Sequence, residues 1–298
     1  MKKKILNVGS LNIDYVYQVP HFVQPGETLS STGYARYPGG KGLNQSVALA
    51  RAGAEVHHVG HVGVDGAWLV DFLKQNGAGV SHLSEVEGPT GHAIIQVNTN
   101  GQNCILIEGG ANRKVTASNV SAAIKELGFE VGDYLLLQNE TSSVAEIIAL
   151  AVEKGIKVVF NPAPMDKTIC DIDLSSVFLL VVNEVEAAEL AGQAECENYE
   201  QLLALLKQRY PKTNILLTLG SRGSVYSSED GASNFEPAKK VVAVDTTAAG
   251  DTFIGYFLAR IAEGAPVAEA MRLATCASAI CVSLVGAAPS IPHISELS

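Results

Sequence analysis

The chain has 298 residues, of which 47% are hydrophobic and 17% charged, so it is long and apolar enough to bury a well-formed core. Its formal net charge of −10 argues against an electrostatic grip on nucleic acid or on an anionic membrane. No apolar run approaches the length of a membrane span, so we expect a soluble protein.

The first predicted element is a short apolar strand at 5–11. Three lysines precede it, as in a signal peptide, but Asn7 and Gly9 interrupt the apolar stretch within a few residues. The five cysteines form no CxxC pair, and their odd number argues against a disulfide framework. We therefore expect the protein in a reducing compartment, the cytoplasm.

Strands and helices then alternate along the chain. Helical spacing predicts helices at 42–52, 67–77, 143–154, 184–191 and 198–209, with a strand at 56–63 between the first two. Near-continuous apolar runs predict strands that are covered on both faces at 134–139, 157–161, 177–183 and 214–220. This βαβ rhythm predicts an α/β fold in one domain over 1–298, with a doubly wound, mostly parallel sheet flanked by helices.

Two segments break this rhythm. Residues 15–38 contain Pro20, Pro25 and Gly33 without a helical period, and residues 91–110 have a hairpin pattern around Asn100-Gly101. We interpret them as parts of one small β-sheet that projects over the strand ends as a lid. A lid of this kind excludes water during a transfer reaction.

Polar and glycine-rich clusters follow several predicted strands, where open α/β sheets bind ligands. Asn12 and Asp14 lie two apart on an extended segment and so face one side, which suits binding of neighbouring sugar hydroxyls. A turn with local Asx hydrogen bonds is the alternative. In PGGKGLNQ at 38–45, glycines allow close backbone approach to a ligand, whereas a plain glycine-rich turn leaves Lys41 and Asn44 unexplained. Neither cluster is a Rossmann fingerprint or a P-loop.

Two further clusters follow later strands. In NEVE, one helical turn brings Asn183 and Glu186 to the same side, where they could hold Mg²⁺ through water, although the same pair also fits a capping box. In TLGSRG at 218–223, Thr218, Ser221 and Arg222 are candidate donors to phosphate oxygens.

The stretch VDTTAAGDTF places Asp245 and Asp251 six positions apart around Ala248, Ala249 and Gly250. The small residues suit a loop that handles phosphate at the start of a helix. An ordinary strand-to-helix turn with a capping aspartate is the alternative, and these residues alone leave both open.

Taken in order, GGKGLNQ, NEVE, TLGSRG and DTTAAGDTF resemble the ribokinase branch of the PfkB family of carbohydrate kinases, and the resemblance runs from GSLNID to GAAPSIP. It implies a ribokinase-like fold with a small β-sheet lid and ATP-dependent phosphorylation of a pentose, above all D-ribose at its 5-hydroxyl. The alternatives are a kinase of a nucleoside, deoxyribose or another sugar, or a catalytically weak sugar-sensing regulator.

The resemblance also implies a role for each cluster. Asp251 matches the catalytic base, which takes the proton from the sugar hydroxymethyl group, and Ala248, Ala249 and Gly250 match an anion hole. The sugar-binding positions are matched by Asn12, Asp14, Gly40, Lys41, Gly42, Asn44, Glu140 and Asp251. The positions for ATP and for Mg²⁺ held through water are matched by Asn183, Glu186, Thr218, Gly220, Ser221, Arg222, Gly223, Gly250 and Thr275. A loop for K⁺ is matched by Asp245, Thr247, Ser290 and, through backbone oxygens, Cys281, Leu284 and Gly286.

Two expectations remain. His57, His58 and His61 suggest a metal site, but on a strand His58 points away from the other two, and no nearby cysteine or acid completes a tetrahedral set. The exposed edge of the lid predicts a homodimer.

Overall fold

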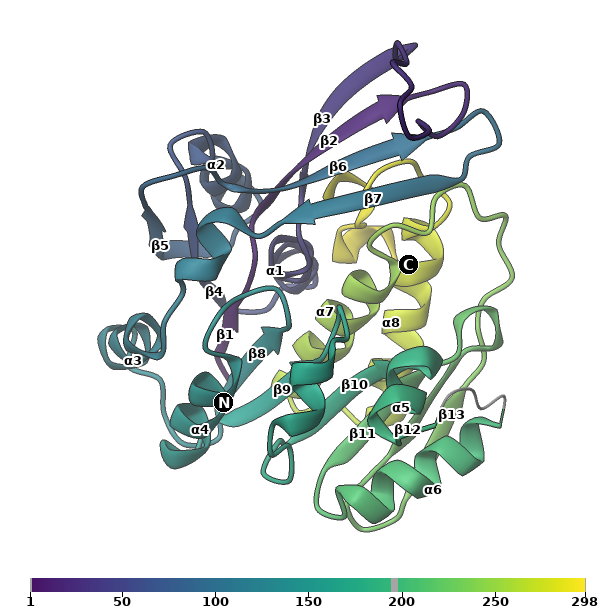
Figure 1. The fold of residues 1–298 in the computed structure, drawn as a ribbon. Helices are drawn as coiled ribbons and strands as arrows, with labels where there is room; N and C mark the ends of the chain where they lie inside the picture. Colours follow the sequence, from purple (N-terminus) through teal and green to yellow (C-terminus); the bar gives the residue numbers. More distant parts are fainter. Residues whose placement is uncertain (1, 194–197, 298) are drawn as a thin grey trace.

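The computed structural model describes residues 2–193 and 198–297. Its main sheet has nine strands in the order β13-β12-β11-β10-β9-β8-β1-β4-β5 (Figure 1). Strands β11 to β5 of this order run parallel, and β12 and β13 add an antiparallel hairpin at one edge. The strands span Ile5–Val8 (β1), Val56–Val62 (β4), Gly79–Glu85 (β5), Tyr134–Gln138 (β8), Lys157–Asn161 (β9), Leu179–Asn183 (β10), Asn214–Thr218 (β11), Ser224–Ser227 (β12) and Ser233–Glu236 (β13).

Helices cover both faces of this sheet, which confirms the predicted doubly wound α/β fold. One face packs against α1 (Lys41–Arg51), α2 (Ala67–Gln75), α7 (Ala249–Ala262) and α8 (Val267–Cys281). The other face packs against α3 (Ala117–Glu126), α4 (Val144–Glu153), α5 (Glu184–Leu190) and α6 (Tyr199–Arg209). Leu136 of β8 packs with the first set, and its neighbours Leu135 and Leu137 pack with the second. A strand buried on both faces therefore reads as an unbroken apolar run.

A separate four-stranded sheet has the order β3-β2-β6-β7, with strands Asn12–Gln18 (β2), Gly33–Gly39 (β3), Gly91–Val97 (β6) and Asn103–Glu108 (β7). It joins both segments that break the βαβ rhythm, and Figure 1 shows it projecting from the main body. The strand predicted over 5–11 is confirmed only as far as Val8, where β1 ends, and the chain then enters the small sheet at Asn12. A Cβ on Gly9 would come within 2.5 Å of the Gly42 Cα, so only glycine fits where α1 packs against the end of β1.

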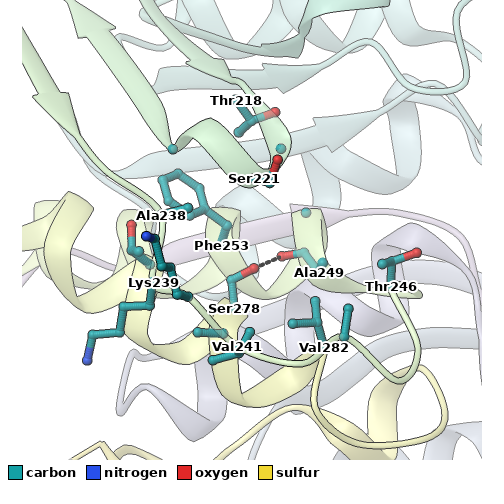
Figure 2. A pocket seen from close by; sticks show the side chains of 17 residues that line it. Thr218, Ser221, Ala238, Lys239, Val241, Thr246, Ala249, Phe253, Ser278 and Val282 are labelled. Atoms are coloured by element: carbon teal, nitrogen blue, oxygen red, sulfur yellow. Dashed lines mark hydrogen bonds between the residues drawn. The ribbon is translucent and has the colours of Figure 1, made fainter.

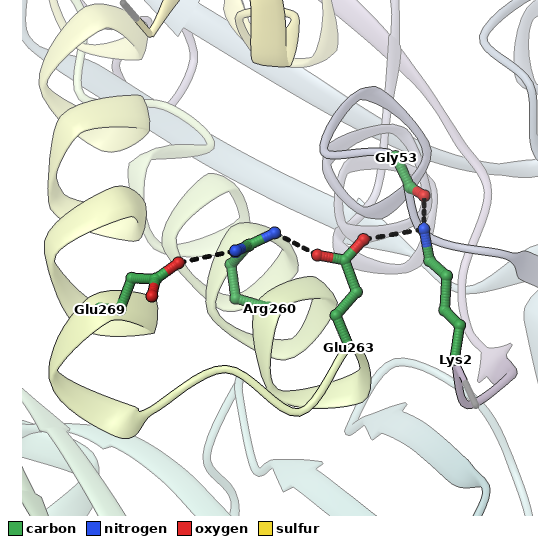
Figure 3. Close-up of polar contacts among 5 residues, drawn as sticks. All are labelled: Lys2, Gly53, Arg260, Glu263 and Glu269. Atoms are coloured by element: carbon green, nitrogen blue, oxygen red, sulfur yellow. Dashed lines mark hydrogen bonds and ion pairs between the residues drawn. The ribbon is translucent and has the colours of Figure 1, made fainter.

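A row of surface ion pairs links the α7–α8 turn to the N-terminal segment (Figure 3). Glu263 lies 2.8 Å from the Lys2 Nζ and also pairs with Arg260, which donates to Glu269 at 2.6 Å. Lys2 also donates to the Gly53 carbonyl just after α1. These side chains are 27–42% exposed, so each pair adds little stability. In the described ranges no helix combines the length and apolar character that a membrane crossing requires.

Candidate active site

Two cavities open at the carboxyl ends of the parallel strands, on either side of the start of α7. The larger, of about 500 Å³, is drawn in Figure 2, with Thr218 and Ser221 on one side and Ser278 and Val282 on the other. The smaller, of about 210 Å³, contains Lys41 and Asp251. Both cavities are lined by Thr218, Thr246, Ala249 and Gly250. A ligand spanning the two would pass directly over the first turn of α7.

The first turn of α7 exposes part of its backbone to both cavities. Ala248, in the N-cap position, has a φ of 60°, a left-handed conformation that turns the chain sharply into the helix. A Cβ on Gly250 would meet nothing within 4 Å, so the space over this residue is free. N–H groups of a first turn have no partner within the helix, and they attract anions. The predicted anion-hole residues therefore lie together at the junction of the cavities.

Asp251 is buried in this turn and is bound by two amides from α1. Asn44 donates to its Oδ2 at 3.0 Å, and Gln45 donates to its Oδ1 at 2.8 Å. The Asn44 Oδ1 is buried and has no hydrogen-bond partner within the described residues. A buried acceptor without a partner costs free energy, so this oxygen is suited to receive a hydroxyl from a ligand.

Carboxylates surround Lys41 on the sugar side predicted from the sequence. Burial lowers the pKa of Lys41, but the charges of Asp251, Glu140 and Glu186 outweigh it, and the net pKa lies above the ordinary value. Glu140 is itself anchored, since it accepts from the Lys41 N–H at 2.9 Å and from the Ser10 hydroxyl. Lys41 therefore stays charged, and Glu140 fixes the loop that carries it.

Asp14 lies in β2 next to the carboxylate of Glu140. Burial, with a smaller contribution from Glu140, raises the pKa of Asp14 to about 7. Asn12 precedes it and is buried, and its Oδ1 accepts from Asn112 at 2.7 Å. Asn112 therefore fixes the orientation of the Asn12 amide, because it already donates to the Asn12 Oδ1.

Of the residues in the 218–223 loop that are predicted to bind ATP, all but one line the larger cavity. Thr218, Gly220, Ser221 and Gly223 line it, whereas Arg222 pairs with Glu184 and is not among the lining residues. Thr275 from α8 also lines this cavity, and its buried hydroxyl oxygen has no partner within the described residues. No prediction from the sequence covered Ala238, Val241, Phe253 and Ser278, which also line this cavity. Two lysines in the segment before Asp245, Lys239 and Lys240, were the available signal.

Asn183 and Glu186 form the capping box that was the alternative interpretation of NEVE, yet both line the smaller cavity. The Asn183 N–H donates to the Glu186 Oε2 at 2.9 Å, and the Glu186 N–H donates to the Asn183 Oδ1 at 2.9 Å. Burial raises the pKa of Glu186, partly offset by Asn183 and Lys41. The carboxylate has a second oxygen, so the capping role and a role toward a hydrated cation are compatible.

Asp245 joins two loops behind the start of α7. Its Oδ1 accepts from the Thr247 N–H at 2.9 Å, and its Oδ2 accepts from the Gly286 N–H at 2.9 Å. Burial raises the pKa of Asp245, but a hydrogen bond from the Thr247 hydroxyl at 2.6 Å, together with these two bonds, lowers it below the ordinary value. The Cys281 sulfur lies 3.1 Å from the Ser290 hydroxyl and 3.7 Å from the Thr247 carbonyl. The Leu284 N–H donates to the Cys281 carbonyl at 3.2 Å, so all six predicted cation-loop residues are linked by contacts.

The three histidines of β4 have separate partners. His58 is fully buried and contacts Ser46 and Gly9, whereas His61 faces Asn119 and His57 faces Glu55. In the described residues no three His, Cys, Asp or Glu side chains gather as a metal site would require.

The chain matches the family model described as pfkB family carbohydrate kinase over residues 2–294. It is 37% identical to a ribokinase of Haemophilus influenzae over 99% of this chain and 97% of that one. It is 38% identical to a ribokinase of Schizosaccharomyces pombe over 98% and 96% of the two chains. Its fold matches the structure of Arabidopsis thaliana ribokinase complexed with ribose and ATP, with a TM-score of 0.89, 29% identity and coverage of 100% and 98%.

Proposed function

The chain belongs to the pfkB family of carbohydrate kinases, and we propose that it transfers the γ-phosphoryl group of ATP to the 5-hydroxyl of D-ribose. The observation that supports this most is the position of Asp251, a buried carboxylate in the first turn of α7, where a nucleotide-sized cavity meets a smaller one. ATP in the larger cavity, with its phosphates extending into the smaller one, would meet ribose bound beside Asp251 on the side of Asn44, so that the reacting atoms face each other across this turn.

The residues take distinct roles in this proposal. Asp251 accepts the proton of the sugar hydroxyl as that oxygen attacks the γ-phosphorus. The Gly250 N–H stabilises the charge on the transferred phosphoryl, and one such donor contributes ~10²–10³ in rate, whereas the Ala249 N–H donates to the Thr246 carbonyl at 3.3 Å. Asn12, Asp14, Asn44 and Lys41 bind sugar hydroxyls. The unpartnered Asn44 Oδ1 supports this assignment.

Two cations complete the proposed site. Glu186 has a carboxylate oxygen at the smaller cavity, an arrangement that fits Mg²⁺ held through water; bound Mg²⁺ would offset the phosphate charge. Oxygens of Asp245, Thr247 and the 281–290 loop, directly behind α7, fit K⁺, a hard cation. Bound K⁺ would fix the backbone that presents the anion hole.

The small sheet bears on assembly. β7 is an edge strand with exposed apolar side chains, and Ile105, Leu106 and Ile107 are 50%, 68% and 51% exposed. Unpaired apolar edges favour association, so we propose a homodimer through this lid, in the cytoplasm. Sedimentation of the wild type against Leu106→Asp tests the dimer, since a monomer in both would contradict it.

A coupled ADP-release assay with a panel of sugars and nucleosides tests the substrate. Ribose should exceed 2-deoxyribose in kcat/KM by roughly 5- to 150-fold, because a missing hydroxyl leaves buried partners unpaired at a cost of about 1–3 kcal/mol. Equal turnover of both, or activity on nucleosides alone, would contradict the ribose assignment. A protein that binds ribose without ATP turnover would instead be a sugar-sensing regulator, which the open space at Gly250 and the buried Asp251 do not favour.

A further inference from the structure

A chain of buried side chains runs from Asp251 across the main sheet to His58. Gln45 donates to the Asp251 Oδ1 at 2.8 Å, and the Gln45 Oε1 accepts from Gln138 at 2.7 Å. Gln138 also donates to the Asn7 Oδ1 at 2.9 Å. The side chains that make up the chain are all buried, with Gln45, Gln138, Asn7, Ser46 and His58 fully so. Buried polar chains of this length are retained at a cost in desolvation, so a role beyond packing is expected.

His58, the last side chain of this hydrogen-bonded row, determines which atom of each pair donates and which accepts. The His58 Nε2 lies 3.1 Å from the Gly9 carbonyl, which only accepts, so this nitrogen must carry a hydrogen. Burial lowers the pKa of His58 to about 4, although the bond to Gly9 opposes the shift, so the ring is neutral and its Nδ1 accepts. Ser46, 2.8 Å away, therefore donates to the Nδ1 and in turn accepts from the Asn7 Nδ2 at 2.8 Å. The Asn7 oxygen is left to face Gln138.

The orientation of the Gln138 amide in turn determines the orientation of the Gln45 amide. With one N–H committed to Asn7, its other N–H points at the Gln45 Oε1. A second contact agrees, because Gln45 also donates to the Asn161 Oδ1 at 3.4 Å, and the Asn161 amide is itself fixed by donating to the Val181 carbonyl at 3.0 Å. A flipped Gln45 would set its oxygen against the acceptors of Asp251 and Asn161, and its NH₂ against a donor.

We propose that Gln45 and Gln138 are positioning residues for Asp251: the buried chain allows only one orientation of the Gln45 amide, and that amide holds the Asp251 carboxylate aimed at the reacting hydroxyl. This inference rests on the proposed role of Asp251 as base. Neither glutamine lines the cavities, so the effect of each on the reaction passes through Asp251.

The test is a double-mutant cycle with Gln45→Met and Gln138→Met in the ribose kinase assay. Gln45→Met should lower kcat by about 10- to 100-fold, the scale of a misplaced catalytic group, with the KM values for ribose and ATP within about threefold of wild type. Gln138→Met should lower kcat less. The double variant should be no slower than Gln45→Met, because Gln138 acts through Gln45. Should Gln45→Met fail to fold, Gln45→Glu keeps the shape and the acceptor for Gln138 but sets a second carboxyl group against Asp251, and it should lower kcat at least as much.

Asn214→Leu is the matched control. Asn214 is a buried amide of the same sheet, at the opposite end of β11, and it donates to the Phe178 carbonyl at 2.8 Å. It should lower the melting temperature and leave kcat unchanged. A kcat within threefold of wild type in the Gln45 variant, additive losses in the cycle, or a loss confined to KM would overturn the inference while an active wild type and an inactive Asp251→Asn keep the proposed function. An inactive wild type would overturn both.

Discussion

The pKa of Asp14 lies near neutrality, so the proposed binding of ribose should depend on pH. Its carboxylate is partly buried in β2, and burial, aided by the neighbouring charge of Glu140, raises its pKa to about 7. In the free protein at pH 7 the group is therefore about half protonated. An ionised carboxylate accepts hydrogen bonds from two sugar hydroxyls more strongly than the neutral acid does. Ribose should accordingly bind the ionised form and release a proton.

The size of the effect follows from the fraction of ionised Asp14. With a pKa of about 7, this fraction is ~0.9 at pH 8 and ~0.1 at pH 6, so the apparent Kd for ribose should rise about tenfold as the pH falls between them. The contribution of Asp14 to the stability of the free protein changes with pH in the opposite direction, falling as the pH rises. The folded state holds this proton more tightly than the unfolded state, so the contribution of Asp14 is most favourable below about pH 4 and is lost as the pH rises through about 7.

Titration calorimetry with ribose alone, at pH 6, 7 and 8, measures the binding effect. Runs at pH 7 in two buffers of different ionisation enthalpy count the released proton, which should be about half per ribose. Asp14→Asn is the control, and it should bind weakly at all three values with no proton release. A Kd that stays constant between pH 6 and pH 8 in the wild type, or that is lowest at pH 6, would refute the reasoning.

Three further outcomes are expected. Asp251→Asn should cut kcat by ~10²–10⁴-fold while calorimetry still detects ribose and ATP binding, and a variant that has lost binding would contradict the role of base. Replacing a bulky organic cation by K⁺ at constant ionic strength should raise wild-type activity, and Asp245→Ala should abolish that response; a wild type indifferent to K⁺ would make Asp245 a capping residue only. Gly42→Val should lower the melting temperature sharply, because a Cβ there would lie 2.3 Å from the Ser10 nitrogen and 2.5 Å from the Gly9 Cα. An unchanged melting temperature with a raised KM for ribose would instead assign Gly42 to ligand contact.

The fold could be predicted where burial imposes a pattern on neighbouring residues. The runs that became β8 to β11 are apolar throughout because alternate side chains enter opposite halves of the core. The antiparallel β12–β13 hairpin was not predicted, since each strand has only four residues and β13, at the sheet edge, alternates between exposed and half-buried residues.

The candidate site divides in the same way. Clusters that are contiguous in sequence, such as 248–251 and 218–223, were identified, and most of their members line the cavities. Gln45 was missed although it belongs to PGGKGLNQ, because its partners Gln138 and Asp251 are distant along the chain. Gly42 was interpreted as a residue that approaches ligand, yet its packing against β1 depends on a contact that no local pattern encodes.

The small sheet begins among residues that are assigned to the sugar in the proposed function. β2 begins at Asn12 and carries Asp14, it pairs with the start of β6 at Gly91, and β3 ends one residue before Gly40 and Lys41. The residues assigned to the nucleotide lie elsewhere, on β10, β11, α7 and α8. Part of the proposed acceptor recognition thus lies on the small sheet, although Lys41, Asn44, Glu140 and Asp251 lie outside it. Exchanging 12–39 and 91–108 with a relative that prefers another sugar would transplant much of the acceptor preference and leave the phosphoryl donor unchanged, which makes this sheet a natural unit for evolution or design to vary.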